Sequence, residues 1–172
     1  MTRDLHIVGF RVGRETYGVP ITSLHEIVRV PEITSVPDAP DYMEGVINLR
    51  GRIVSVIDLR KRFGEKEIRT HRQNRILVVE HNGRLSGLIV DSATEVLKIP
   101  AADVEASPAG FEEGNLNCVS GLGKYGGRLI VLLEMATLLE FSRSIRGNRE
   151  KESAGTSQSP ESVKQATAAG KP

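Results

Sequence analysis

The sequence of 172 residues lacks tryptophan, and aromatic residues make up only 4% of it. A core without large aromatic side chains must be packed from valine, isoleucine and leucine, which favours strands over aromatic-anchored helices. The hydrophobic share of 39% is enough for the core of one ordinary domain or of two small subdomains. We therefore expect a mainly β fold.

The chain also lacks the residues that most metal and catalytic sites need. Cys118 is the single cysteine, which excludes an intramolecular disulfide and a thiolate zinc site and leaves it as a small buried or half-buried residue. The histidines are scattered without metal-ligand spacing, at His6, His25, His71 and His81. The glycine-rich segment 121–127 carries no Ser or Thr after its lysine, so we interpret it as a turn and not a phosphate loop. We expect no metal, no cofactor and no enzyme activity.

No apolar run approaches the roughly 18 residues of a membrane span, and the charge pair Arg3-Asp4 stands where a signal peptide has its apolar core. We therefore expect a soluble, cytoplasmic protein. Because the formal net charge is only +1, the chain has no strong field to hold a polyanion. The basic run Arg60-Lys61-Arg62 is expected to be a solvated loop.

Residues 45–59 contain the longest β-branched run of the chain and predict a hairpin. Asparagine and glycine in Asn48-Leu49-Arg50-Gly51 tolerate the positive φ of a tight turn, which leaves Arg50 exposed at its tip. Ile57, at the end of the run, is expected to face the core of a first barrel.

The other expected elements follow from their periodicity. A hairpin is expected over residues 5–21 and another from residue 76, with an Asn82-Gly83 turn. Apolar residues three and four apart predict a short helix over residues 23–30, with Thr22 or Ser23 as its N-cap, and a closing helix over 134–141. Residues 65–74 are expected to form a surface loop.

An internal repeat relates the two halves of the chain. In a first register Ile7 falls on Ile76 and Gly18 on Gly87, and in a second register Gly45 falls on Gly121. The two registers correspond to offsets of about 69 and about 76 residues, so the second copy has a few extra residues, placed within 106–118. The repeat indicates two similar small β-barrels, which protect the edges of a short meander.

The C-terminal segment differs in composition from the rest of the chain. Residues 146–172 consist mainly of lysine, glutamate, serine, glutamine, alanine, glycine and proline. They have too few apolar side chains to offset the entropy lost on ordering. We expect a disordered tail.

Four motifs along the chain resemble those of the CheW family, whose members are adaptors between chemoreceptors and the histidine kinase CheA. The longest is GVINLRGRIVSVIDL at residues 45–59, followed by RKRFG at residues 60–64. The others are Tyr17-Gly18 to Glu26-Ile27, residues 87–91 with Glu95-Val96, and residues 121–123 with Leu133. The resemblance extends to about Glu140 and implies a CheW-like domain over 1–145, made of two similar five-stranded, SH3-like barrels with short helices.

The resemblance also implies the partners and their sites. The helical tip of a chemoreceptor is expected in the groove between the barrels, at positions that match Leu24, Glu26, Gly45, Asn48, Arg50, Gly87 and Val96. One barrel face is expected to pair with the regulatory domain of CheA, with no individual contact assigned, and the protein is expected at membrane-associated receptor arrays. Which chemoreceptors the protein binds, and whether the pathway controls flagella, pili or another output, stays open.

A small β-barrel that binds nucleic acid is the alternative interpretation, with the basic stretch from Arg60 to Arg75 as its footprint. It is disfavoured because the chain has few aromatic residues for base stacking and almost no net charge.

Overall fold

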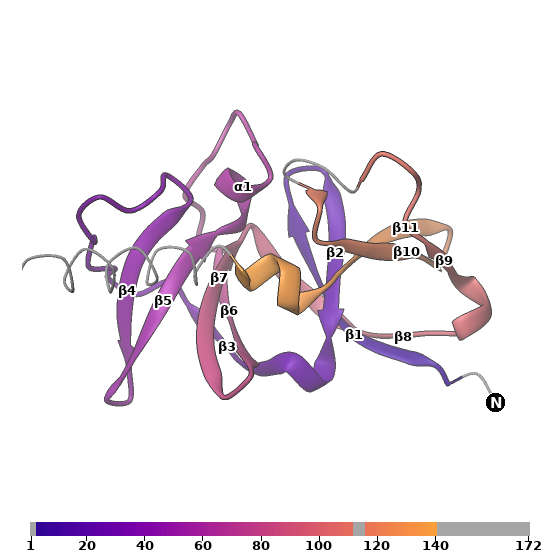
Figure 1. Ribbon diagram of the computed structural model, residues 1–172, viewed down its shortest axis with the longest axis horizontal. Coiled ribbons are helices and arrows are strands. Elements are labelled where there is room, and N and C mark those ends of the chain that lie inside the picture. Colours follow the sequence, from indigo (N-terminus) through magenta and orange to yellow (C-terminus); the bar gives the residue numbers. More distant parts are fainter. Residues whose placement is uncertain (1–2, 112–115, 141–172) are drawn as a thin grey trace, which may run out of the picture.

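The computed structural model describes residues 3–111 and 116–140, which form two curled β-sheets side by side (Figure 1). The strands are β1 (Leu5–Val12), β2 (Glu15–Pro20), β3 (Leu24–Arg29), β4 (Met43–Leu49), β5 (Arg52–Asp58), β6 (Arg75–His81), β7 (Arg84–Val90), β8 (Ser92–Ile99), β9 (Val104–Ala106), β10 (Val119–Tyr125) and β11 (Arg128–Leu133). The helical pieces are short: η1 (Ile21–Ser23), α1 (Leu59–Arg62), η2 (Ala101–Asp103) and residues 135–140. The expected mainly β fold is confirmed.

The five strands of sheet I have the same order as the first five strands of sheet II. Sheet I has the order β3-β6-β7-β5-β4, and sheet II has the order β8-β1-β2-β11-β10-β9. In each sheet one parallel pairing joins two antiparallel hairpins, β5 with β7 in sheet I and β11 with β2 in sheet II. In the repeat, β6 is the counterpart of β1 and β10 is the counterpart of β4, so sequence counterparts hold the same place in the two sheets.

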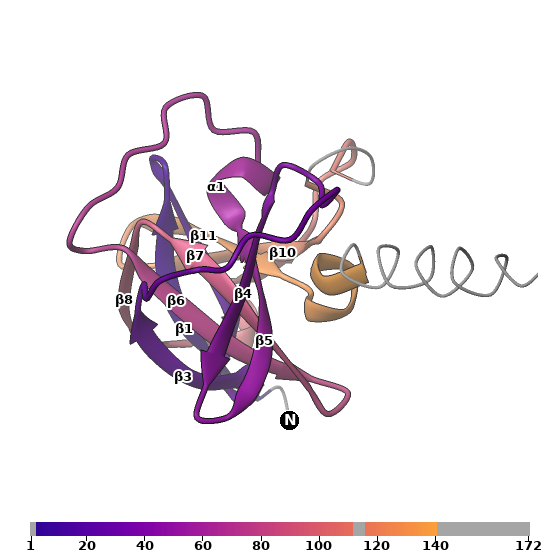
Figure 2. The ribbon, with the colours of Figure 1, turned by 90° about the vertical axis from the view of Figure 1, so that its left-hand side faces the viewer.

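Each sheet is built from both halves of the chain. The hairpin β1–β2 opens the first half but pairs in sheet II, and the hairpin β6–β7 opens the second half but pairs in sheet I. Figure 1 shows the indigo β1 and β2 lying in the right-hand sheet beside the orange strands, and Figure 2 shows the strands of sheet I from their own side. The two sheets are therefore joined by an exchange of hairpins as well as by side-chain packing.

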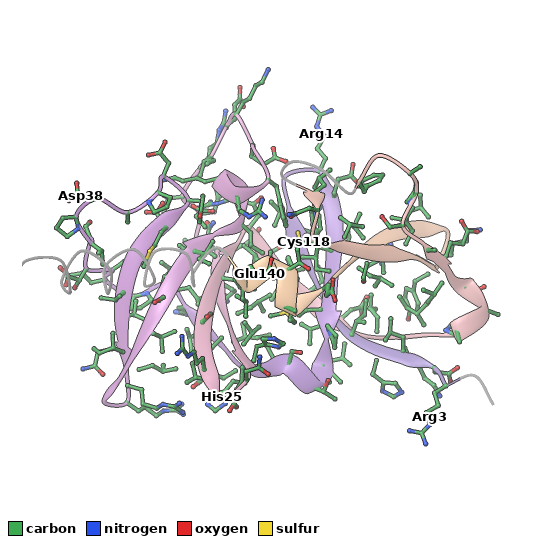
Figure 3. All side chains as sticks on the ribbon, viewed as in Figure 1. Arg3, Arg14, His25, Asp38, Cys118 and Glu140 are labelled. Carbon is green, nitrogen blue, oxygen red and sulfur yellow. The ribbon has the colours of Figure 1, made fainter. Side chains whose placement is uncertain are left out.

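The apolar residues form three clusters. A small cluster lies inside each curled sheet, around Val54 and Ile76 in sheet I and around Ile7 in sheet II. The largest cluster lies between the sheets and includes the fully buried Cys118 and Ile57, which is 3% exposed. Ile57 is buried as expected, but in this shared core and not in the core of the first barrel. Figure 3 shows Cys118 where the two sheets meet. Burial of this shared apolar surface holds the sheets together.

The expected helix over residues 23–30 is wrong. That segment forms η1 and then β3, whose residues are alternately half-buried and exposed and which pairs with β6 at the edge of sheet I. Strand pairing outweighs the spacing of Leu24, Ile27 and Val28, because β-branched Ile27 and Val28 fit a pleated sheet as well as a helix.

The barrels are open, since no pairing within residues 3–111 and 116–140 joins the two edges of either sheet. Sheet II also has a sixth strand, β9, whose counterpart in sheet I is a single bridge between Thr34 and Val46. The described part of the chain contains no helix long and apolar enough to cross a membrane. The expected tail, 146–172, lies outside the described residues.

Candidate functional site

Arg50 stands at the tip of the β4–β5 hairpin, as predicted, with its side chain 78% exposed. Arg50 and Gly51 both have positive φ, 51° and 84°, and the Asn48 side chain accepts a hydrogen bond from the Gly51 N–H at 2.8 Å. A non-glycine residue in this left-handed conformation is under backbone strain. The turn therefore presents a cation at some cost to its own stability.

The Arg50 guanidinium pairs with Glu26 of β3, with 3.0 Å between Nη2 and Oε2. β3 is the edge of sheet I farthest from β4 in strand order, so the pair closes the curled sheet where no strand pairing does. His25 lies 3.9 Å from Glu26 and 3.8 Å from Glu80, measured between ring nitrogens and carboxylate oxygens. Glu26 fixes the arginine at a surface where planar guanidinium donors can engage a carboxylate partner.

Exposed aliphatic side chains occur at counterpart positions of the two sheets. Ile27 and Ile53 of sheet I are 41% and 66% exposed, and Val96 and Leu129 of sheet II are 58% and 55% exposed. Ile27 corresponds to Val96 in the first register of the repeat, and Ile53 corresponds to Leu129 in the second. Isolated exposed apolar residues are ordinary, whereas repetition of the same two positions indicates a surface feature of both sheets.

The two glycines among the predicted receptor positions have structural reasons. Gly45 has a φ of 145°, and a Cβ there would lie 2.0 Å from the carbonyl oxygen of Thr34. A Cβ on Gly87 would lie 2.8 Å from Cγ2 of Ile76 on the paired strand. A side chain at Gly45 would clash with the backbone of Thr34, and one at Gly87 would require the Ile76 side chain to shift, so both glycines shape the surface without offering a contact.

The structure brings together three of the seven predicted receptor residues, Glu26, Asn48 and Arg50. Leu24 is partly buried against the shared core between the sheets. Val96 lies on β8 of sheet II, paired with Val8. The seven positions come from β3, from β4 and its turn, and from β7 of sheet I, and from β8 of sheet II, which contacts β6 of sheet I.

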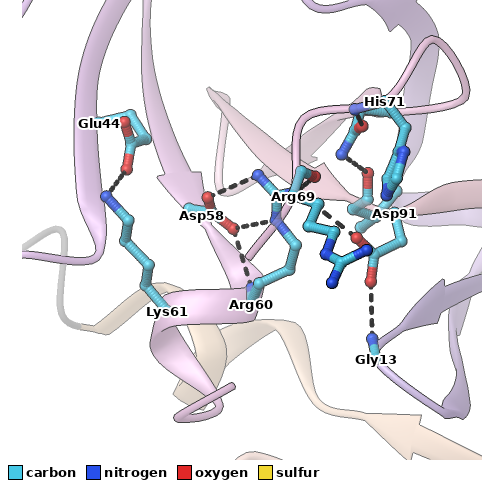
Figure 4. A network of polar contacts seen from close by, with 10 residues as sticks. Gly13, Glu44, Asp58, Arg60, Lys61, Arg69, His71 and Asp91 are labelled. Carbon is cyan, nitrogen blue, oxygen red and sulfur yellow. Dashed lines mark hydrogen bonds and ion pairs between the residues drawn. The ribbon is translucent and has the colours of Figure 1, made fainter. Parts of the chain in front are cut away.

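The expected solvated loop at Arg60-Lys61-Arg62 is wrong for both arginines, which are 6% and 4% exposed. Arg60 pairs with Asp58 at 2.9 Å and with Asp91 at 3.5 Å, and it donates to the carbonyl of Arg69 at 2.8 Å (Figure 4). Burial would lower the pKa of Arg60, but its bonds to Asp58 and Asp91 raise it. A basic run gives no signal of these partners, which lie at the ends of other segments.

This buried network also connects the sheets. Asp91, which follows β7 of sheet I, accepts a hydrogen bond at 2.7 Å from the N–H of Gly13, in the β1–β2 turn of sheet II. Arg62 donates to Asn117 at 3.2 Å. The two arginines are therefore structural and cannot serve in the footprint of the nucleic-acid alternative. Among the described residues, no cluster of three or more His, Cys, Asp or Glu could hold a metal ion.

Comparison with known proteins decides the family. The family model described as the CheW-like domain matches residues 6–143. The chain belongs to the CheW-like family. It is 37% identical over 136 residues to the chemotaxis protein CheW of Helicobacter pylori, covering 79% of this chain and 82% of that protein. It is 32% identical over 130 residues to CheW of Klebsiella aerogenes, covering 76% and 78% of the two chains.

A solved CheW structure has the same fold. The crystal structure of the scaffolding protein TtCheW from Thermoanaerobacter tengcongensis matches with a TM-score of 0.71 and 36% identity, over 78% of this chain and 90% of that one. The resemblance inferred from the motifs is therefore confirmed, as is the description as two SH3-like subdomains. The chain is a CheW-type adaptor of chemotaxis signalling, and the nucleic-acid alternative is not favoured.

Proposed function

We propose that the chain couples chemoreceptors to the histidine kinase CheA by binding both, without catalysing a reaction. Membership of a family of scaffolding proteins supports this proposal. The observation that carries it is the exposed Arg50, held in a strained turn and fixed by Glu26. Backbone strain that persists at a surface position indicates selection for the side chain and not for the turn.

In this proposal the helical tip of a receptor binds across the region marked by Leu24, Glu26, Gly45, Asn48, Arg50, Gly87 and Val96. Arg50 supplies a charged contact, and Leu24 and Val96 supply apolar area, as in other complexes of a helix in a groove. Gly45 and Gly87 act indirectly, because a side chain at either position would displace the neighbouring Thr34 backbone or Ile76 side chain.

The regulatory domain of CheA binds another face, and residues 1–145 form the domain that carries both faces. The protein then works in the cytoplasm, recruited to receptor arrays. Holding receptor and kinase on one rigid body raises their effective concentration for each other. It can bias the kinase between conformations only through contacts that differ between them.

A charge swap separates the role of Arg50 in binding from its role in the fold. Arg50→Glu should weaken receptor binding at least tenfold, because a carboxylate replaces the cation at the contact. The double variant Arg50→Glu with Glu26→Arg restores an ion pair between β3 and the turn but leaves the charge at the tip reversed. Receptor and kinase binding are measured separately for each purified full-length variant, beside a thermal melt.

If Arg50 contacts the receptor, the double variant regains the wild-type melting temperature and stays defective in receptor binding, while kinase binding changes little. Full recovery of receptor binding in the double variant would show that the ion pair matters only for the fold. Arg128→Glu is the matched control, since Arg128 follows the corresponding turn of sheet II. It should leave receptor binding within about twofold of wild type.

A further inference from the structure

A cleft of about 510 Å³ opens between sheet I and the helix at residues 135–140. Figure 3 shows Glu140 on this helix beside sheet I. The volume is in the range of small-ligand sites, and Arg50 is not part of the lining. The residues that line the cleft from β5, β7 and the helix include Arg52, Arg84, Leu85, Ser86, Leu139 and Glu140.

The corresponding place in sheet II is filled. In the repeat, Tyr17 is the counterpart of Ser86 in the first register, and Phe63 is the counterpart of Leu139 in the second. The rings of Tyr17 and Phe63 stack with centroids 4.7 Å apart and planes at 21°, and Tyr17 also stacks on Phe10. The cleft beside sheet I therefore lies where the repeat replaces an aromatic ring by a serine.

Polar groups in the cleft lack partners. Ser86 is 7% exposed, and its hydroxyl has no hydrogen bond to any residue in the described part of the chain. The oxygen is reached by solvent, so the hydroxyl can donate a hydrogen bond to a ligand in the cleft. Arg52 and Arg84 are exposed and form no ion pair with residues 3–111 or 116–140. The opposing charge in the lining is the carboxylate of Glu140.

We propose that this cleft binds a small ligand with an apolar body and one anionic group, a carboxylate or a phosphate. The body takes the place that the Tyr17 ring fills in sheet II, against Leu85 and Leu139. The anionic group lies near Arg52 and Arg84, whose guanidinium groups recognise both anions. Ser86 donates a hydrogen bond, and Glu140 disfavours a second anionic group at the opposite side.

The test is a titration of the full-length protein followed by NMR, with benzoate and phenyl phosphate as probes and benzyl alcohol as the uncharged control. We expect saturable shifts at Ser55 and Ser86, and at least tenfold tighter binding of one anion than of benzyl alcohol. The tighter of the two anions identifies the group. Arg52→Gln and Arg84→Gln should each weaken binding at least fivefold, and Arg128→Gln, the counterpart of Arg52 in sheet II, should not change it.

Ser86→Tyr gives the cleft the residue that fills its counterpart and should abolish binding. Should this variant fail to fold, the two arginine variants still decide the outcome. Equal loss in Arg128→Gln, shifts that do not saturate, or equal binding of benzyl alcohol would overturn the proposal. Tighter binding of hexaglutamate than of either probe would overturn the assignment to a small ligand. Arg50→Glu should leave probe binding unchanged, so this site and the receptor surface can fail independently.

Discussion

The hairpins β4–β5 and β10–β11 occupy the same place in sheets I and II, but their turns differ. The first turn is Arg50-Gly51 and the second is Gly126-Gly127, and all four residues have positive φ, from 51° to 84°. Glycine adopts this conformation without steric cost, whereas arginine is strained by roughly 1–2 kcal/mol. The turn of sheet II therefore has the residues that its backbone conformation favours, whereas the turn of sheet I retains the arginine side chain in spite of the strain.

The interior shows the same contrast. Asp58 and Arg60 in the first half correspond to Glu134 and Ala136 in the second, and only the first pair forms a buried ion network within the described residues. Ile57 corresponds to Leu133, and both are buried in the core between the sheets. Apolar positions of the core are thus shared by the two halves, while the charged positions have diverged.

Removing the buried cation should have the largest effect on stability. Arg60→Ala leaves Asp58, which is 2% exposed, without its partner, and breaking a buried pair in this way costs about 3–5 kcal/mol. Urea unfolding measures the change. Lys61→Ala is the control, because Lys61 pairs with Glu44 nearer the surface and should cost no more than about 1 kcal/mol. Equal losses of stability in the two variants would mean that the buried network around Arg60 does not stabilise the fold more than a surface ion pair does.

Truncation of the shared core should affect both halves alike. Ile57→Ala and Leu133→Ala each leave a cavity between the sheets and should cost about 2–5 kcal/mol. Denaturant unfolding of both variants tests whether Ile57 and Leu133 contribute equally to the free energy of unfolding. A loss below about 0.5 kcal/mol, the range of ordinary surface substitutions, would contradict the place of Ile57 in the core.

Tyr17 should make the fold sensitive to alkali. Burial, with the nearby charges of Glu15, Glu65 and Cys118, raises the pKa of Tyr17 to about 12. In the unfolded chain a tyrosine loses its proton near pH 10, so stability is full below pH 10 and falls between pH 10 and about 12. Tyr17→Phe should remove about 2 kcal/mol of this alkaline loss, measured by urea unfolding across the pH range. An unchanged pH dependence would contradict the assignment.

Relief of the strained turn should have the smallest effect. Arg50→Asn places a residue that tolerates positive φ, as Asn82 does in the β6–β7 turn, but removes the ion pair with Glu26. The two terms oppose each other, so the free energy of unfolding should change by no more than about 0.5 kcal/mol. Receptor binding should nevertheless fall. A large loss of stability would assign Arg50 to the fold.

Much of the fold could be predicted from the sequence because β-branched runs and Asn-Gly or Gly-Gly turns are local signals. The prediction for residues 23–30 failed because Glu26 faces the half-buried side of β3, where its partner Arg50 comes from another hairpin. A polar residue on the inner side hides the alternation of a strand. No pattern within one segment can reveal such a partner.

The candidate site was predictable only in part. The exposure of Arg50 followed from its turn, and the pair with Glu26 did not. The basic run at residues 60–62 has the pattern of a solvated segment, because only the fold buries it against the neighbouring Asp58 and brings Asp91 and Asn117 to it. The cleft beside Ser86 is visible only when the two halves are compared in three dimensions, because one serine in a strand carries no signal.

The exchange of hairpins sets an order for synthesis on the ribosome. Sheet I spans residues 24–90 and can form as soon as β7 has emerged, whereas β2 waits for its partner β11, which ends at Leu133. At ordinary translation rates this wait is on the order of ten seconds. During it the β2 edge of the apolar hairpin at residues 5–20 stays unpaired, and a nascent-chain chaperone would be expected to shield it.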